Sequence, residues 1–246
     1  MSTNTEYIVQ IEKLLNESFN RISPIGIYLT NNFEANENDE TFIFTIDILK
    51  RIQANIKILL AIKISEDTCV AYRLIMRSIT ADIIESVYIL LVSEEKRKRE
   101  VRNRNLYRLR TLKTYLSNKV EFFNSRDNKN KIEFSLNMLY NKFPDYVDDS
   151  TGDFYRKKGN EEMSTTSMIE YLVKENIISK EYNQLTINYR LLSFTEHYAP
   201  IIRRYSYNNP LEIIIYVDII KWIAVGIELL CNVIRDYYKI HNTQND

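Results

Sequence analysis

The stretch EDTCVAYRLIMRSITADIIESVYILLV, residues 66–92, decides the fold. It contains neither glycine nor proline, and at helical pitch its apolar residues cover most of the helix surface. Arg73 and Arg77 are the exceptions, because both lie on an otherwise apolar stripe that includes Val70 and Ile84. A helix that is apolar on most sides packs in the middle of a bundle. The sequence therefore predicts a central, buried helix over residues 66–92.

A second helix of this kind is predicted over residues 211–238. It is preceded by Asn209 and Pro210, a capping residue followed by a proline at the first helical position. The chain has only four glycines and four prolines in 246 residues, whereas turn-rich sheet proteins use many more of both. We therefore expect an all-α fold, a bundle of about seven or eight helices around 66–92 and 211–238, in a single domain over residues 1–246.

The remaining helices are predicted from their amphipathic periodicity. A helix over residues 5–22 is expected to end at Ser23-Pro24, because the residue before a proline is pushed out of the helical conformation. Residues 144–163 are predicted to form a long loop, and residues 241–246 a frayed tail. Further helices are predicted over residues 41–64, about 96–123, 131–143, the segment capped by Ser164, and 180–198.

Composition narrows the classes of function. The 33 Lys and Arg residues balance 33 Asp and Glu residues, so any attraction to nucleic acid must come from a local cluster.

The first residues do not resemble a secretory signal, and charges interrupt the most apolar segment, 211–231. Cys69 and Cys231 lie singly in apolar runs, which is typical of small buried side chains in a reducing compartment. The acids of 144–163 lack the spacing of an EF-hand. We expect a cytoplasmic protein with no membrane span, no metal site and no cofactor.

The two arginines on the apolar stripe need acceptors, because an unpaired buried charge is strongly destabilising. Acids of the same helix project from another face, so the partners of Arg73 and Arg77 are expected on other helices. The acids that we consider are Glu196, Glu212 and Glu228. Two interpretations are open. The arginines belong to a buried ion-pair network that fixes helix register, or they form an anion or phosphate pocket in the bundle core.

A second group of polar residues lies in the predicted helix 180–198. Arg190 and His197 are seven residues apart, two helical turns, so they share a face with Ser193 between them. This spacing is similar to the R-x(4–6)-H signature of HEPN-type ribonucleases, small helical proteins of bacterial toxin and defence systems. The resemblance implies that the histidine is acid and base, that the arginine binds the scissile phosphate, and that cleavage needs no metal and usually a homodimer cleft. The alternative is a histidine packed in the core, and Leu191 stands where HEPN sequences usually have a polar residue.

A different resemblance spans roughly residues 70–198. It is carried by Met76-Arg77-Ser78 in an apolar helix, by the aromatic and basic residues 154–157, and by Tyr189-x-x-Leu192-Ser193-x-x-x-His197. These motifs resemble a family of bacterial helical proteins of unknown function that has an R-S-x-x-E helix and a Y-x-x-L-S-x-x-x-H helix. The resemblance implies a bundle in which Arg77, Ser193 and His197 converge, and it implies no established activity. The glutamate of the first motif is Ala81 here, with Asp82 next to it.

The predicted helix after Val92 is strongly basic. Residues 96–113 hold nine basic side chains and one acid, Glu100. Cations on one helix can follow a phosphate backbone, and Tyr107 and Tyr115 can stack on bases. The alternative is a solvated helix face. The arginines expected to bind nucleic acid are Arg97, Arg99, Arg102, Arg104, Arg108 and Arg110.

Together these patterns favour a bacterial helical protein, associated with defence or stress, that binds RNA through residues 96–113 and cleaves it with Arg190 and His197. The competing interpretation is a non-catalytic, dimeric interaction module. In that case the network of Arg73, Arg77, Ser193 and Glu196, together with His197, only stabilises the core. We expect a homo-oligomer.

Overall fold

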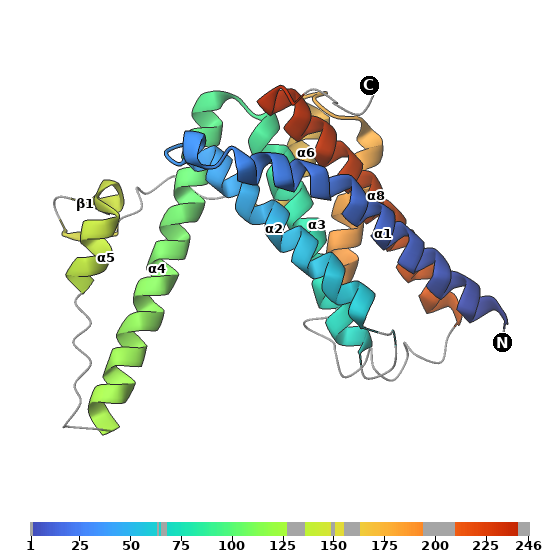
Figure 1. The fold of residues 1–246 in the computed structure, drawn as a ribbon, viewed down its shortest axis with the longest axis horizontal. Helices are drawn as coiled ribbons and strands as arrows, with labels where there is room; N and C mark the ends of the chain where they lie inside the picture. The colour runs from blue at the N-terminus through green and yellow to red at the C-terminus, as the bar shows by residue number, and fades with distance from the viewer. Residues whose placement is uncertain are drawn as a thin grey trace. The chain divides into compact units, whose positions relative to one another are not determined.

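The computed structural model describes residues 2–62, 64, 68–126, 136–148, 151–154, 163–193 and 210–240, which are almost entirely helical (Figure 1). The prediction of an all-α multi-helix bundle is thus confirmed. The helices are α1 (Ser2–Asn31), α2 (Glu40–Ala61), α3 (Cys69–Leu91), α4 (Glu94–Arg126), α5 (Leu136–Lys142), α6 (Thr165–Lys174) and α8 (Pro210–Tyr238), and residues 183–193 are also helical. Short 3-10 helices span Glu34–Asn36, Pro144–Tyr146 and Lys180–Tyr182. Among the described residues, no helix is both long enough and apolar enough to cross a bilayer.

The chain divides into two compact units. The larger unit comprises residues 1–93 and 163–246, and the smaller unit comprises residues 94–162. The single domain expected over residues 1–246 stays a prediction.

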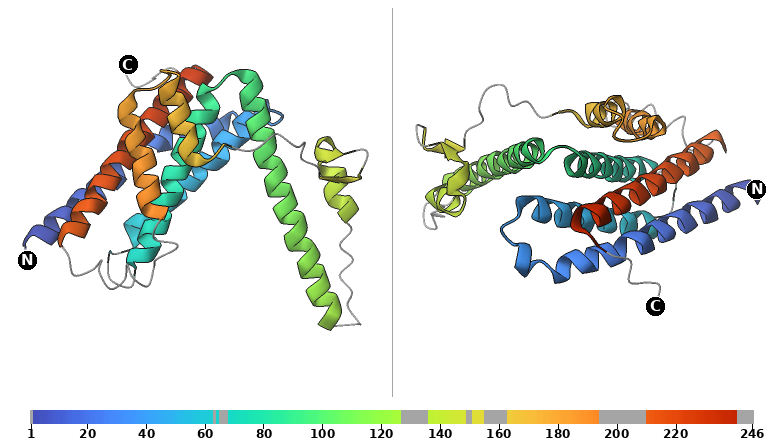
Figure 2. Two further views of the ribbon diagram at one scale, coloured as in Figure 1. Left: turned by 180° about the vertical axis from the view of Figure 1, so that it is seen from behind. Right: turned by 90° about the horizontal axis from the view of Figure 1, so that it is seen from above.

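In the larger unit, α3 lies between α6 on one side and α2 and α8 on the other, as the view from above in Figure 2 shows. Helix α1 packs along both α2 and α8. The core includes fully buried side chains of α1 and α2 and, from α3 and α8, those of Met76, Ile79, Ile83, Ile220, Ile223 and Ile227. Each such side chain stabilises the fold by about 1.5–3 kcal/mol. The two helices predicted to be central therefore both contribute to the core of this unit.

Gly226 on α8 lies close to side chains of two other helices. A β-carbon at this position would lie 3.0 Å from Cγ2 of Ile83 on α3 and 3.2 Å from Cδ2 of Leu185 in the helix 183–193. Because these contacts are tighter than ordinary van der Waals packing, glycine leaves room for the side chains of Ile83 and Leu185 against α8.

Helix α1 does not end at Ser23-Pro24, so that prediction is wrong. The helix continues to Asn31 with Pro24 inside it. An interior proline removes a hydrogen bond and costs about 3 kcal/mol. The apolar stripe continues beyond it, however, and Ile22, Ile25 and Leu29 are buried. Burial of these three side chains outweighs the penalty of the proline.

The ends of the helices follow capping rules where the structure describes them. The carboxylate of Asp39 accepts hydrogen bonds from the backbone N–H groups of Thr41 and Phe42, which starts α2. Ser164 caps α6 as predicted, and its Oγ accepts from the backbone N–H of Ser167 at 3.2 Å.

The smaller unit consists of α4, α5 and a two-stranded antiparallel hairpin of β1 (Val147–Asp148) and β2 (Asp153–Phe154). The prediction that residues 144–163 are irregular is therefore wrong at this hairpin. Gly152 lies in the turn with φ of 65°, a conformation that glycine adopts without strain. The core of the unit joins α4 to the hairpin through the buried side chains of Leu106, Leu109, Leu139, Tyr146 and Phe154.

Candidate functional site

Arg73 and Arg77 are half-buried and contact side chains of other elements. Nε of Arg73 donates to the hydroxyl of Tyr216 on α8 at 2.7 Å, and the guanidinium lies 5.2 Å from the centre of that ring. Nε of Arg77 donates to Oγ of Ser193 at 3.0 Å. Its Nη2 donates to the hydroxyl of Tyr189 at 3.1 Å, and the guanidinium lies 5.1 Å from the centre of the Tyr189 ring. Hydroxyl oxygens therefore accept hydrogen bonds from these two guanidinium groups, and two tyrosine rings lie against them.

The three acids considered as partners for these arginines fall into two groups. Glu228 forms an ion pair with Arg21 on α1 at 2.5 Å. The side chains of Glu196 and Glu212 lie outside the described residues. Sequence reasoning did not name Tyr189 or Tyr216 as acceptors. The signal for Tyr189 was its place four residues before Ser193, one helical turn away on the same face.

Arg77 and Ser193 are brought together, whereas His197 lies outside the described residues. Oγ of Ser193 donates to the backbone carbonyl of Tyr189 at 2.8 Å while it accepts from Arg77. Its proton is thus directed toward the helix backbone and its oxygen is bound by a cation. This arrangement suits a structural or anion-binding role for Ser193 and disfavours a nucleophilic one.

Asp82 follows Ala81, which stands in place of the glutamate of the R-S-x-x-E motif. It is buried and joins α3 to α2. Its carboxylate accepts two hydrogen bonds from Arg51, at 2.8 Å from Nε and 2.6 Å from Nη2. The hydrogen bond with Asp82 raises the pKa of Arg51 above its ordinary value. Such a two-pronged pair fixes the relative position of two helices. Sequence reasoning missed Arg51 because nothing in its own helix distinguishes it from a solvated arginine.

Arg190, one of the two residues expected to be catalytic, lies at the surface. Its Nη2 pairs with Oε1 of Glu170 on α6 at 2.7 Å, and the two side chains are 58% and 51% exposed. Arg190 follows Tyr189 directly, so its side chain leaves the helix about 100° away from the tyrosine that contacts Arg77. The structure therefore places Arg190 apart from the Arg77 contacts.

The basic helix predicted after Val92 is α4, and its six arginines differ in their surroundings. Arg99, Arg102, Arg108 and Arg110 are exposed, and Arg97 is half-buried. Arg104 is buried, and its Nη1 pairs with Oε2 of Glu100 at 2.8 Å. Its guanidinium is not presented to solvent. Arg102 donates to the backbone carbonyl of Asp145 and lies over the ring of Tyr146. Among these six arginines, Arg99, Arg108 and Arg110 are therefore the best placed to meet a phosphate backbone.

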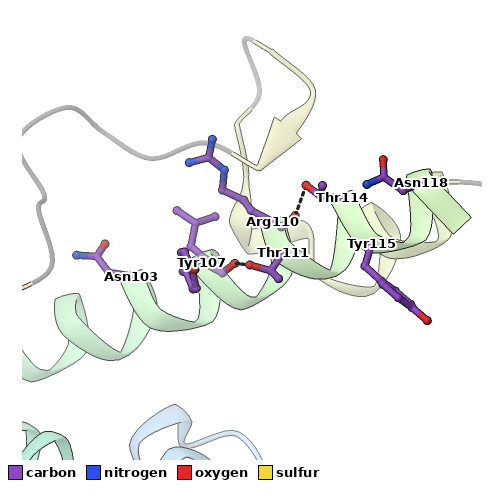
Figure 3. A pocket seen from close by; sticks show the side chains of 8 residues that line it. Asn103, Tyr107, Arg110, Thr111, Thr114, Tyr115 and Asn118 are labelled. Atoms are coloured by element: carbon purple, nitrogen blue, oxygen red, sulfur yellow. Dashed lines mark hydrogen bonds between the residues drawn. The ribbon is translucent and has the colours of Figure 1, made fainter. Parts of the chain in front are cut away.

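One face of α4 carries a pocket of about 550 Å³, which we call the α4 pocket (Figure 3). Tyr107 and Tyr115, which sequence analysis considered for base stacking, both line it and are 64% and 59% exposed. Its lining residues are Asn103, Leu106, Tyr107, Arg110, Thr111, Thr114, Tyr115 and Asn118. The threonines and asparagines of this face were not singled out from the sequence.

Opposite charges attach the hairpin to α4. Nζ of Lys113 lies 2.5 Å from Oδ2 of Asp153, and the hydroxyl of Tyr140 donates to Oδ1 of the same carboxylate at 3.1 Å. The hydrogen bond from Lys113 holds the pKa of Asp153 below its ordinary value, and the same contact raises the pKa of Lys113. Lys113 therefore attaches the hairpin to α4, and Asp153 partly neutralises its charge.

Comparison with protein-family models, with curated proteins and with solved structures finds no match for this chain. Among the described residues, no three His, Cys, Asp or Glu side chains gather as a metal site requires.

Proposed function

We propose that this protein binds RNA through α4. The observation that carries the proposal is the presence, on one helix, of the exposed arginines Arg99, Arg108 and Arg110 beside the exposed rings of Tyr107 and Tyr115. Proteins bind nucleic acid strands with two components, cationic side chains that contact the phosphates and aromatic rings that stack on the bases. The proposal needs neither a metal nor a cofactor.

The distribution of charge supports the proposal. Residues 94–162 hold seventeen lysines and arginines and twelve aspartates and glutamates, so this unit has a formal charge of +5 and the rest of the chain −5. The zero net charge of the whole chain therefore hides a basic unit and an acidic one. A polyanion is attracted to the first and repelled by the second, which favours contact with α4.

The test is the salt dependence of RNA binding by the full-length protein. Each arginine that neutralises a phosphate of a single strand contributes about 0.7 to the slope of log affinity against log salt. Replacing Arg99, Arg108 and Arg110 by glutamine should weaken binding of a labelled oligonucleotide and reduce that slope by about 2. Fluorescence anisotropy at several salt concentrations measures both.

The matched control replaces three exposed lysines of the larger unit, Lys13, Lys50 and Lys57, by glutamine. This variant loses the same number of charges and should keep the wild-type slope. Equal slopes for the two triple variants, or no binding by the wild type at low salt, would contradict the proposal.

Cleavage by Arg190 and His197 is the catalytic form of the same proposal, and it rests on the resemblance to HEPN-type ribonucleases. It is supported by the exposed position of Arg190, since an exposed ion pair such as Arg190–Glu170 contributes only about 0.2–1 kcal/mol and a phosphate can displace it. His197→Ala should abolish RNA degradation and leave the melting temperature nearly unchanged. Wild-type protein that binds RNA and leaves it intact would restrict the function to binding.

A non-catalytic interaction module is the second candidate. The contacts of Arg73 with Tyr216 and of Arg77 with Tyr189 and Ser193 favour it, because they join α3 to other elements as a structural network does. This candidate predicts a homodimer in solution, no affinity for RNA, and a large loss of stability when Arg77 is replaced. Light scattering on the purified protein measures the oligomeric state.

A further inference from the structure

The α4 pocket is built from residues at helical spacing along a single helix. Tyr107, Thr111 and Tyr115 follow one another at intervals of four residues, and Arg110 lines the pocket beside them (Figure 3). With a rise of 1.5 Å per residue, the two tyrosines leave the helix about 12 Å apart along its axis. This separation leaves each ring room to stack on a different base.

The surface between the tyrosines is apolar although it is lined by threonines. Oγ1 of Thr111 donates to the backbone carbonyl of Tyr107 at 3.0 Å, and Oγ1 of Thr114 donates to that of Arg110 at 3.0 Å. Because these hydroxyls are bound to the helix backbone, the threonine methyl groups are left to line the pocket. Methyl groups and two exposed aromatic rings offer van der Waals and stacking contacts to a flat aromatic group.

We infer that the α4 pocket binds single-stranded RNA, with two of its bases stacked on Tyr107 and Tyr115 and a phosphate against Arg110. The inference rests on the proposed function, RNA binding through α4, and specifies that the RNA is single-stranded. In an RNA duplex, neighbouring base pairs cover the faces of the bases, and the major groove is too deep and narrow for side chains to read. Only unpaired bases can reach the two rings, so duplex RNA is excluded from this mode of binding.

Charge complementarity favours RNA over a second copy of this chain as the occupant. Arg108 and Arg110 are exposed beside the tyrosines, and a second copy would bring the same cations to the same face. The phosphates of RNA have the opposite charge and gain from each arginine. The pocket therefore combines an apolar floor for bases with a cationic edge for the backbone.

The experiment compares full-length variants in the binding of three labelled probes of equal length: a single-stranded oligouridine, an RNA duplex, and an abasic single strand. Replacing Tyr107 and Tyr115 together by leucine should weaken binding of the oligouridine by about 10- to 100-fold, because stacking on each ring is lost. Replacing both by phenylalanine keeps the rings and should change the affinity by less than about 3-fold. The salt slope of the leucine variant should equal that of the wild type, since no cation is removed.

Tyr28→Leu is the matched control, because Tyr28 is an exposed tyrosine on α1 in the larger unit. It should bind oligouridine as the wild type does. The wild type should bind oligouridine more tightly than the abasic strand or the duplex. Binding of oligouridine by the leucine variant at wild-type affinity, or equal affinity for duplex and single strand, would overturn the inference.

The outcomes separate this inference from the proposed function. If the leucine variant binds RNA as the wild type does, while replacement of Arg99, Arg108 and Arg110 weakens binding, only the stacking mode is overturned. Absence of RNA binding by the wild type overturns both. Self-association of the wild type that the leucine variant loses, without affinity for RNA, identifies a second copy as the occupant and overturns the inference.

Discussion

Nε of Arg77 donates a hydrogen bond to Oγ of Ser193 at 3.0 Å and thereby joins α3 to the helix 183–193, across 116 residues of sequence. The same guanidinium donates to the hydroxyl of Tyr189, and Ser193 donates to the backbone carbonyl of Tyr189. Hydrogen bonds thus connect Arg77, Tyr189 and Ser193 to one another. Because the guanidinium is half-buried and its fork is rigid, the set fixes how the two helices lie against each other.

Replacing Arg77 should destabilise the larger unit. Arg77→Met removes at least two hydrogen bonds from a charged donor, each of which contributes about 1.5–3 kcal/mol, so we expect a loss of about 3–6 kcal/mol. Ser193→Ala removes one of them and should lose about 1.5–3 kcal/mol. Urea denaturation followed by circular dichroism measures both. The double variant should be more stable than the sum of the single losses implies, because the two residues interact directly. Strict additivity would show that the Arg77–Ser193 contact contributes nothing.

The Arg51–Asp82 pair should respond differently to the loss of each partner. Asp82 is buried, with its side chain 6% exposed, whereas the side chain of Arg51 is 44% exposed. Arg51→Met leaves a buried carboxylate without its arginine and should cost about 3–5 kcal/mol. Asp82→Asn leaves an arginine that can turn toward water, and its cost should be smaller. Thermal unfolding of both variants measures the difference. Equal losses, or a larger loss for Asp82→Asn, would contradict this account.

The fold was largely predictable because it depends on apolar periodicity. The central helices 66–92 and 211–238 are apolar on most sides over many turns, and they correspond to α3 and α8, while the other helices have a periodic apolar stripe. Local rules failed where tertiary burial opposed them, as at Pro24, where Ile25 and Leu29 pack beyond the proline. The hairpin at 147–154 was missed because two-residue strands have no detectable alternation.

The site was predictable only in part. The arginines on an apolar stripe indicated polar partners on other helices, and Arg77 and Ser193 do meet. The partner types were not predictable, because helical periodicity shows on which face an arginine lies and does not show whether a hydroxyl or a carboxylate meets it from another helix. The basic run in 96–113 was plain in the sequence, but burial of Arg104 beside Glu100 depends on tertiary packing.

Pro24 provides a test of how tertiary burial overrides a local rule. Pro24→Ala restores a backbone N–H in the interior of α1 at an exposed position, so no packing is lost. We expect stabilisation of about 1–3 kcal/mol. For a protein of this size, the melting temperature should rise by roughly 2–4 °C per kcal/mol.

The control for this change is Pro210→Ala. Pro210 is the first residue of α8, where its missing N–H has no intrahelical partner. Its replacement should leave the melting temperature nearly unchanged. Differential scanning calorimetry of the two variants and the wild type distinguishes the positions. A Pro24→Ala variant that melts no higher than the wild type would show that α1 is adapted to the proline.

The contact between Lys113 and Asp153 predicts how the attachment of the hairpin depends on pH. The hydrogen bond from Lys113 lowers the pKa of Asp153, so its contribution to stability is fully present above the unfolded-state pKa of about 3.9. It is lost as the pH falls through the lowered pKa of the folded state. The same contact raises the pKa of Lys113. In alkaline solution, the contribution of the contact to stability is therefore lost as the pH rises through the raised pKa of Lys113. Between about pH 5 and pH 9 the contact should therefore be constant.

An NMR titration of the Asp153 carboxyl carbon tests this prediction. In the wild type the carboxyl should titrate below the ordinary pKa of an aspartate, and in Lys113→Gln its pKa should rise, because the largest cause of the shift has been removed. The side chain of Asp153 is 45% exposed, so the contact contributes less than about 1 kcal/mol, and hydrogen exchange in β2 is a better readout of stability than global unfolding. Exchange should be faster in Lys113→Gln than in the wild type at neutral pH, and the difference should disappear in acid. An Asp153 carboxyl that titrates at the same pH in both proteins would show that Lys113 does not hold the hairpin.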